Sequence, residues 1–120
     1  MVDGENIEDY LKEIIFSNND IEIKITHRTL KHIVEQRKKD NYSIDNVVNI
    51  FIVLQDSLDT DNYHILKHNN SYIFTEKIYA DKKGVFIVLE IISISKKSYY
   101  IRTAFFRLIS KIQNLIQKIT

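Results

Sequence analysis

The stretch VFIVLEIISISKKSYYIRTAFF, residues 85–106, decides the fold of this chain. Residues 85–94 and 98–106 are rich in β-branched and aromatic side chains, and the polar pair Lys96-Lys97 separates them. Such runs favour strands, and a connection this short joins antiparallel neighbours. The stretch therefore predicts a β-hairpin.

Two further runs of the same kind precede the hairpin. NYHILK (62–67) and SYIFTEKIY (71–79) are separated by Asn69-Asn70, and Asp81-Lys82-Lys83-Gly84 leads into the hairpin. Asn, Asp and Gly are typical of tight turns. Residues 62–106 are therefore predicted to form a four-stranded antiparallel meander.

Helical periodicity predicts helices on either side of this meander. The apolar stripes are Ile7, Tyr10, Leu11, Ile14 and Ile15 in residues 5–17; Leu30, Ile33 and Val34 in a helix from Thr26 or His27 to about Asp40; Ile44, Val47, Val48, Phe51 and Leu54 in a helix capped by Ser43; and Leu108, Ile109, Ile112, Leu115, Ile116 and Ile119 at the end. IEIKI, 21–25, alternates and predicts a short strand. We expect an α+β fold, with N-terminal helices followed by the four-stranded antiparallel meander and a C-terminal helix.

Length and composition place the chain among single globular domains. It has 120 residues, of which 44% are hydrophobic and 28% charged, and it contains no cysteine. One domain over residues 1–120 is expected, without disulfides or a Cys nucleophile. No run is long and apolar enough to span a bilayer, so no membrane partner is expected. Four scattered histidines without a carboxylate cluster predict no metal site, and no cofactor-binding motif occurs.

The charge is distributed unevenly along the chain. Residues 1–20 contain six acids and one base, a net charge of −5, whereas residues 21–120 sum to +6. The predicted helix within ITHRTLKHIVEQRKK, 25–39, carries two histidines and five Lys or Arg against one Glu. This pattern suits one wall of a site that binds a polyanion, and it also suits a helix face that is simply solvated.

THRTLKHIVEQRKK on a helix, followed by a second helix and a meander ending in IRTAFF, resembles the phage and toxin nucleases of the barnase, EndoU, colicin and RelE-like fold. The resemblance covers roughly residues 21–107. It implies metal-independent RNA cleavage, with tRNA as one possible target, and a toxin that is countered by an immunity protein or antitoxin. Such a toxin acts in the cytoplasm and is delivered from another cell or encoded by a phage.

The resemblance also implies a set of site residues. His32, Arg37 and Thr103 would be catalytic. The residues expected to bind the RNA are His27, Lys31, Lys38, Arg102 and Tyr99. No cofactor is implied.

The residue geometry leaves parts of this site open. On a helical wheel Arg37 lies on the side of Leu30, whereas His32 points away from the stripe, so a joint His32–Arg37 site is difficult and His27 competes with His32. In a regular strand Tyr99, Ile101, Thr103 and Phe105 share one face, so only one of Arg102 and Thr103 faces a cleft. Glu90 is a spare acid–base candidate.

Two other functions stay open on the sequence alone. One is a non-catalytic interaction module, such as an immunity protein or antitoxin, whose acidic first segment imitates nucleic acid. The other is a degenerate member of the nuclease fold that binds RNA without cutting it.

Overall fold

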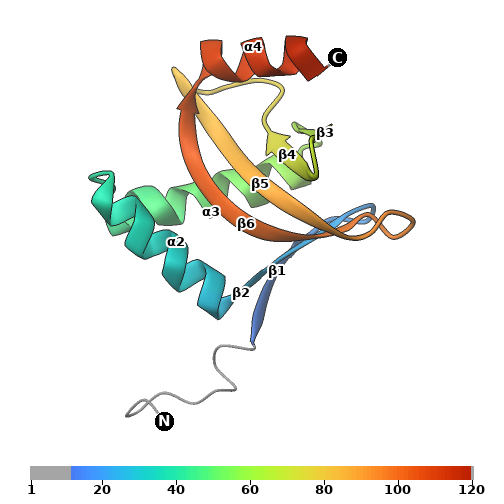
Figure 1. The fold of residues 1–120 in the computed structure, drawn as a ribbon, viewed down its shortest axis with the longest axis horizontal. Coiled ribbons are helices and arrows are strands. Elements are labelled where there is room, and N and C mark those ends of the chain that lie inside the picture. Colours follow the sequence, from blue (N-terminus) through green and yellow to red (C-terminus); the bar gives the residue numbers. More distant parts are fainter. Residues whose placement is uncertain (1–11, 120) are drawn as a thin grey trace.

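The computed structural model describes residues 12–119 of the chain. Its elements are β1 (Glu13–Ser17), β2 (Glu22–Thr26), α2 (His27–Lys39), α3 (Ile44–Asp59), β3 (His64–His68), β4 (Ser71–Thr75), β5 (Lys83–Ser93), β6 (Ser98–Leu108) and α4 (Ile109–Ile119). The described residues form an α+β structure in which a mixed six-stranded sheet has the order β1-β2-β6-β5-β4-β3 (Figure 1).

The predicted meander is present within this larger sheet. Strands β3, β4, β5 and β6 are consecutive antiparallel neighbours. Two of the connecting turns contain a residue with positive φ, Asn69 at 55° and Lys97 at 49°. Asn adopts this conformation more readily than most residues, because its short polar side chain can hydrogen-bond locally.

The prediction of a helix over residues 5–17 is wrong for its C-terminal part. Residues 13–17 form β1, in which Ile14 pairs with Ile25 and Phe16 with Ile23 on the antiparallel strand β2. The apolar pattern there fits both periods, and the open edge of β2 offers backbone partners that a helix would leave unused. Residues 5–11 of the predicted helix lie outside the described residues.

Strand β2 extends the meander by pairing with β6 in the parallel direction. The pairing covers only Glu22–Lys24 of β2, opposite Ser98–Tyr100 of β6. The chain then turns at His27 into α2, which lies beside β6 in Figure 1. The sheet is therefore mixed and six-stranded, where the sequence predicted four antiparallel strands.

The predicted strand 71–79 ends four residues early, at Thr75. Glu76 turns inward, and its carboxylate accepts a hydrogen bond of 3.0 Å from the Val85 N–H. The Asn62 side chain holds Ile78, accepting from its N–H at 2.8 Å and donating to its carbonyl at 2.9 Å. These contacts replace ladder bonds, and they pull residues 76–79 out of the sheet.

The starts of the two long helices are confirmed. The Thr26 hydroxyl accepts a hydrogen bond from the Thr29 N–H at 3.1 Å, which caps α2. Ser43 caps α3 in a capping box with Asn46. Both caps satisfy backbone N–H groups that a helix start leaves without intrahelical partners.

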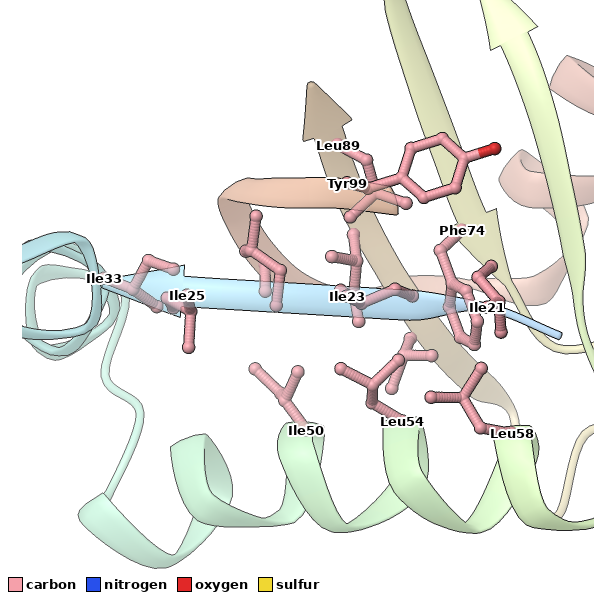
Figure 2. Close-up of a cluster of buried hydrophobic side chains, with 14 of the residues drawn as sticks. Ile21, Ile23, Ile25, Ile33, Ile50, Leu54, Leu58, Phe74, Leu89 and Tyr99 are labelled. Atoms are coloured by element: carbon pink, nitrogen blue, oxygen red, sulfur yellow. The ribbon is translucent and has the colours of Figure 1, made fainter. Parts of the chain in front are cut away.

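The core lies on both faces of the sheet. On one face, Ile21, Ile23 and Ile25 meet a row of side chains from α3 (Figure 2). That row is Ile50, Leu54 and Leu58. On the other face, α4 inserts Ile112 against residues of β4 and β5. Burial of these apolar side chains stabilises the α+β arrangement.

A bulge in β6 changes which side chains share a face. Val88 of β5 is opposite Thr103, but the next residue, Leu89, is opposite Ile101, so Arg102 is the additional residue. Ile101 consequently packs in the cluster with α3, whereas Phe105 packs in the cluster with α4. The expectation that Ile101, Thr103 and Phe105 share one face is therefore wrong, because a bulge resets the alternation of a strand.

Candidate functional site

A polar hollow between α2 and β6 brings several predicted site residues together. We call it the basic groove, and its lining residues are Arg28, Thr29, Lys31, His32, Glu35 and Arg102. It encloses about 500 Å³. With His32 neutral, three cations and one carboxylate give it a net charge of +2. A groove of this charge attracts anions.

The fold explains why this groove forms where it does. Strand β2 stops pairing with β6 at Tyr100, and the first turns of α2 then lie beside β6 in place of a strand. On α2, residues 28, 31, 32 and 35 recur at helical spacing and share one side of the helix. Across the groove, the bulge at Arg102 directs that exposed side chain away from the regular ladder. The groove therefore depends on where β2 ends and α2 begins.

A second hollow lies on the other side of Arg102. Its lining residues are Thr26, Thr29, Glu90, Tyr100, Ile101 and Arg102. Because Thr29 and Arg102 line both hollows, they form the divide between them. His32 therefore belongs to one hollow and Glu90 to its neighbour, and Arg102 lines both.

Hydrogen bonds hold the surroundings of the second hollow. The Tyr100 hydroxyl donates to the Glu13 carboxylate. That hydrogen bond raises the pKa of the Tyr100 phenol above its usual range, with burial adding to the shift and Lys24 opposing it. Lys24 lies 3.2 Å from the Glu22 carboxylate. The Arg102 guanidinium donates weakly, at 3.4 Å, to the Ser71 hydroxyl, so it is anchored on the far strand.

The groove contains His32, Lys31 and Arg102 from the predicted set, and it adds Arg28, Thr29 and Glu35. The helical spacing of residues 28, 31, 32 and 35 is a sequence signal that could have found Arg28 and Glu35, but it does not include Thr29. Two other predicted RNA-binding residues lie elsewhere on α2. The His27 N–H donates to the Lys12 carbonyl at 3.0 Å, and Lys38 is exposed in the last turn.

Arg37 does not join His32. Its guanidinium lies 5.3 Å from the centre of the Phe105 ring and 5.9 Å from that of Tyr42, and it pairs with the Asp40 carboxylate at 3.3 Å. Only 14% of its side chain is exposed. Arg37 thus leaves α2 on the apolar side, as the helical wheel predicted, and contacts Phe105 on β6. In this position it connects the end of α2 to the sheet.

Thr103 and Tyr99 also lie outside the lining of the basic groove. Thr103 is half-buried opposite Val88, on the face that α4 covers. Tyr99 is buried in the core edge to face with Tyr72, and burial raises the pKa of its phenol. Their roles in catalysis and binding stay predictions. The aromatic ring in the second hollow belongs to Tyr100.

Residues 12–119 lack two features. No group of three or more His, Cys, Asp or Glu side chains in this part of the chain could hold a metal ion. None of its helices is long and apolar enough to cross a membrane.

Comparison of the chain with family models, curated proteins and solved structures gives no match.

Proposed function

We propose that this chain is a metal-independent ribonuclease whose site is the basic groove and the hollow beside it. One observation carries the proposal. Three residues of α2 and one of β6, separated widely in sequence, converge on one open groove: Arg28, Lys31, His32 and Arg102. Cations that converge from different elements can bind one phosphate together. A helix face that is simply solvated does not require a cation from another element beside it.

The chemistry requires three roles. A base removes the proton from the ribose 2′-hydroxyl, and the 2′-oxygen then bonds to phosphorus while the bond from phosphorus to the 5′-oxygen breaks. An acid protonates the departing 5′-oxygen, and cations stabilise the charge on the phosphorane. The products are a 2′,3′-cyclic phosphate end and a 5′-hydroxyl end.

The two hollows supply candidates for each role. His32 and Glu90 are the groups that can exchange protons, one on each side of Arg102. A phosphate seated on Arg102 would have one of them near each of its reacting oxygens. Arg28 and Lys31 would bind the same phosphate or its neighbour in the strand. Thr103 adjoins Arg102 in the chain and stays a predicted contributor.

The test is incubation of the purified chain with total cellular RNA in EDTA, resolved on a denaturing gel. We expect discrete fragments with cyclic phosphate ends, lost in His32→Gln and Arg102→Gln. His68→Gln and Lys96→Gln are matched controls, because both residues lie outside the two hollows. Thr103→Ala tests the predicted contribution of that hydroxyl.

Intact RNA at high protein concentration overturns cleavage, and a binding assay then separates the alternatives. Binding that weakens in Arg102→Gln assigns the chain to RNA binding without cutting. Absence of binding assigns it to the interaction modules, among them immunity proteins and antitoxins. If cleavage is found, the domain acts on RNA in the cytoplasm, and we propose that an immunity protein or antitoxin restrains it.

A further inference from the structure

A second groove, on the side of α2 opposite the basic groove, is almost wholly apolar. We call it the apolar groove. Its lining residues are Ile14, Phe16, Ile25, Leu30, Val34, Ile44, Val47, Val48, Phe51, Ile52 and Gln55. It encloses about 430 Å³ between β1, α2 and α3, and Gln55 is its one polar lining residue.

The residues at the mouth of this groove are unusually exposed for their type. Ile44, Val48 and Ile52 are 53%, 48% and 59% exposed, and they follow one another at every fourth position along α3. The opposite side of α3 already packs in the core through Ile50 and Leu54 (Figure 2). A helix that is apolar on two sides needs a second partner, because contiguous exposed apolar surface is rare on isolated domains.

The sequence that precedes β1 has the apolar pattern of a segment that binds in such a groove. Ile7, Tyr10 and Leu11 stand at i, i+3 and i+4, the spacing of one apolar stripe on a helix. Apolar anchors at this spacing are how an amphipathic helix binds in a groove.

The position of Lys12 brings this segment to the groove. The Lys12 carbonyl accepts a hydrogen bond from the His27 N–H at 3.0 Å, which holds the chain beside the start of α2. Two residues later, Ile14 lines the groove. Leu11 is three residues from Ile14, a reach of roughly 10 Å. The row from Ile44 to Ile52 is about 12 Å long, which a helix of about eight residues covers.

We propose that the apolar groove is the docking site for residues 1–11 of the same chain, with Ile7, Tyr10 and Leu11 inserted between α2 and α3. A tethered segment binds at a high effective concentration, so a modest interface is sufficient to keep it docked. This inference rests on the apolar groove alone and is independent of the ribonuclease proposal.

A nitroxide label tests the docking directly, because the chain has no native cysteine. Ile52→Cys places a label on the wall of the groove, and Asp45→Cys places one on α3 beside Ile44 without removing a lining side chain. We expect either label to broaden the amide signals of Ile7–Leu11 in NMR spectra. A label at Ile94→Cys, 75% exposed on the β5–β6 hairpin, is the control and should leave them sharp.

Unbroadened signals with both α3 labels overturn the proposal. A second sample shows whether the contact is between molecules. It mixes chain that carries the nitroxide but no isotope enrichment with isotope-enriched chain that carries no nitroxide. Broadening of the amide signals of Ile7–Leu11 in this mixture also overturns the proposal, in favour of docking onto a second copy. A further readout is the double variant Ile7→Asp/Leu11→Asp, which should increase the fluorescence of a dye that binds apolar surface. Asn6→Asp is the matched control for the double variant, because it adds charge to the segment outside the apolar stripe. It should leave the fluorescence of the dye unchanged.

Discussion

The Tyr42 hydroxyl accepts a hydrogen bond of 2.9 Å from the Phe106 N–H and donates to the Phe106 carbonyl at 3.5 Å. One side chain thus satisfies both backbone groups of a β6 residue that has no strand partner on that side. The rings of the two residues also stack, with centroids 6.3 Å apart. The contact ties the chain just after α2 to β6, and Thr26 caps the other end of the helix. Both ends of α2 are therefore fixed, which holds its basic side over Arg102.

Tyr42→Phe removes this hydroxyl and keeps the ring stacking. We expect the free energy of unfolding to fall by about 1–3 kcal/mol, because the half-buried Phe106 N–H loses its partner. Urea denaturation measures the loss. Tyr63→Phe is the matched control, because the Tyr63 ring stacks on Phe74 but its hydroxyl makes no hydrogen bond within residues 12–119. Equal stability of wild type and Tyr42→Phe would show that the contact does not hold α2.

Arg37→Met separates a structural role of Arg37 from a catalytic one. Methionine keeps an unbranched stem but loses the guanidinium that lies over Phe105 and Tyr42. We expect a loss of stability of roughly 1–2 kcal/mol, since that contact is largely desolvated. RNA cleavage measured well below the melting temperature should stay near wild type. A variant that folds normally but does not cleave RNA would restore the predicted catalytic role.

The salt dependence of RNA binding measures how many phosphates the basic groove neutralises. For single strands, the logarithm of the binding constant falls with the logarithm of salt concentration by about 0.7 for each phosphate neutralised. Arg102→Gln should therefore make the slope shallower by about 0.7. Lys96→Gln, on the β5–β6 turn, should leave it unchanged. An unchanged slope in Arg102→Gln would mean that Arg102 contacts no phosphate.

Glu76 should make stability depend on pH. Burial raises the pKa of its carboxyl above the usual 4.5, Asp56 adds to the shift, and the Val85 N–H opposes it. Because the folded state holds this proton to higher pH than the unfolded state does, stability falls as pH rises from 4.5 through the raised pKa and is then level. Glu76→Gln keeps an acceptor oxygen for Val85 and cannot ionise.

The free energy of unfolding of Glu76→Gln, relative to wild type, should therefore increase over that pH window. Urea denaturation at a series of pH values measures it. A difference between the two proteins that is constant with pH would show that Glu76 ionises alike in the folded and unfolded states.

Local patterns were sufficient to predict much of this fold. Thr26 and Ser43 mark the starts of α2 and α3, because a hydroxyl before an apolar stripe can cap a helix. Asn69 and Lys97 lie in the turns that the polar pairs predicted. The helical wheel likewise placed His32 away from the apolar stripe of α2. Each of these features depends on interactions between residues close in sequence.

Pairing between distant segments decided the rest. Residues 13–17 fit a helix or a strand by pattern, and the edge of β2 selected the strand. The bulge that turns Arg102 out of the ladder depends on how β5 and β6 meet, and it separated Thr103 from Ile101 against the expected alternation. Arg37 lies on Phe105 and away from His32 because α2 packs beside β6. The sequence by itself determined the helices α2, α3 and α4 and the strands of the meander, and it placed His32 away from the apolar stripe of α2. Only the tertiary structure decided which side chains meet in the groove, because strand register and helix docking depend on contacts that no local pattern records.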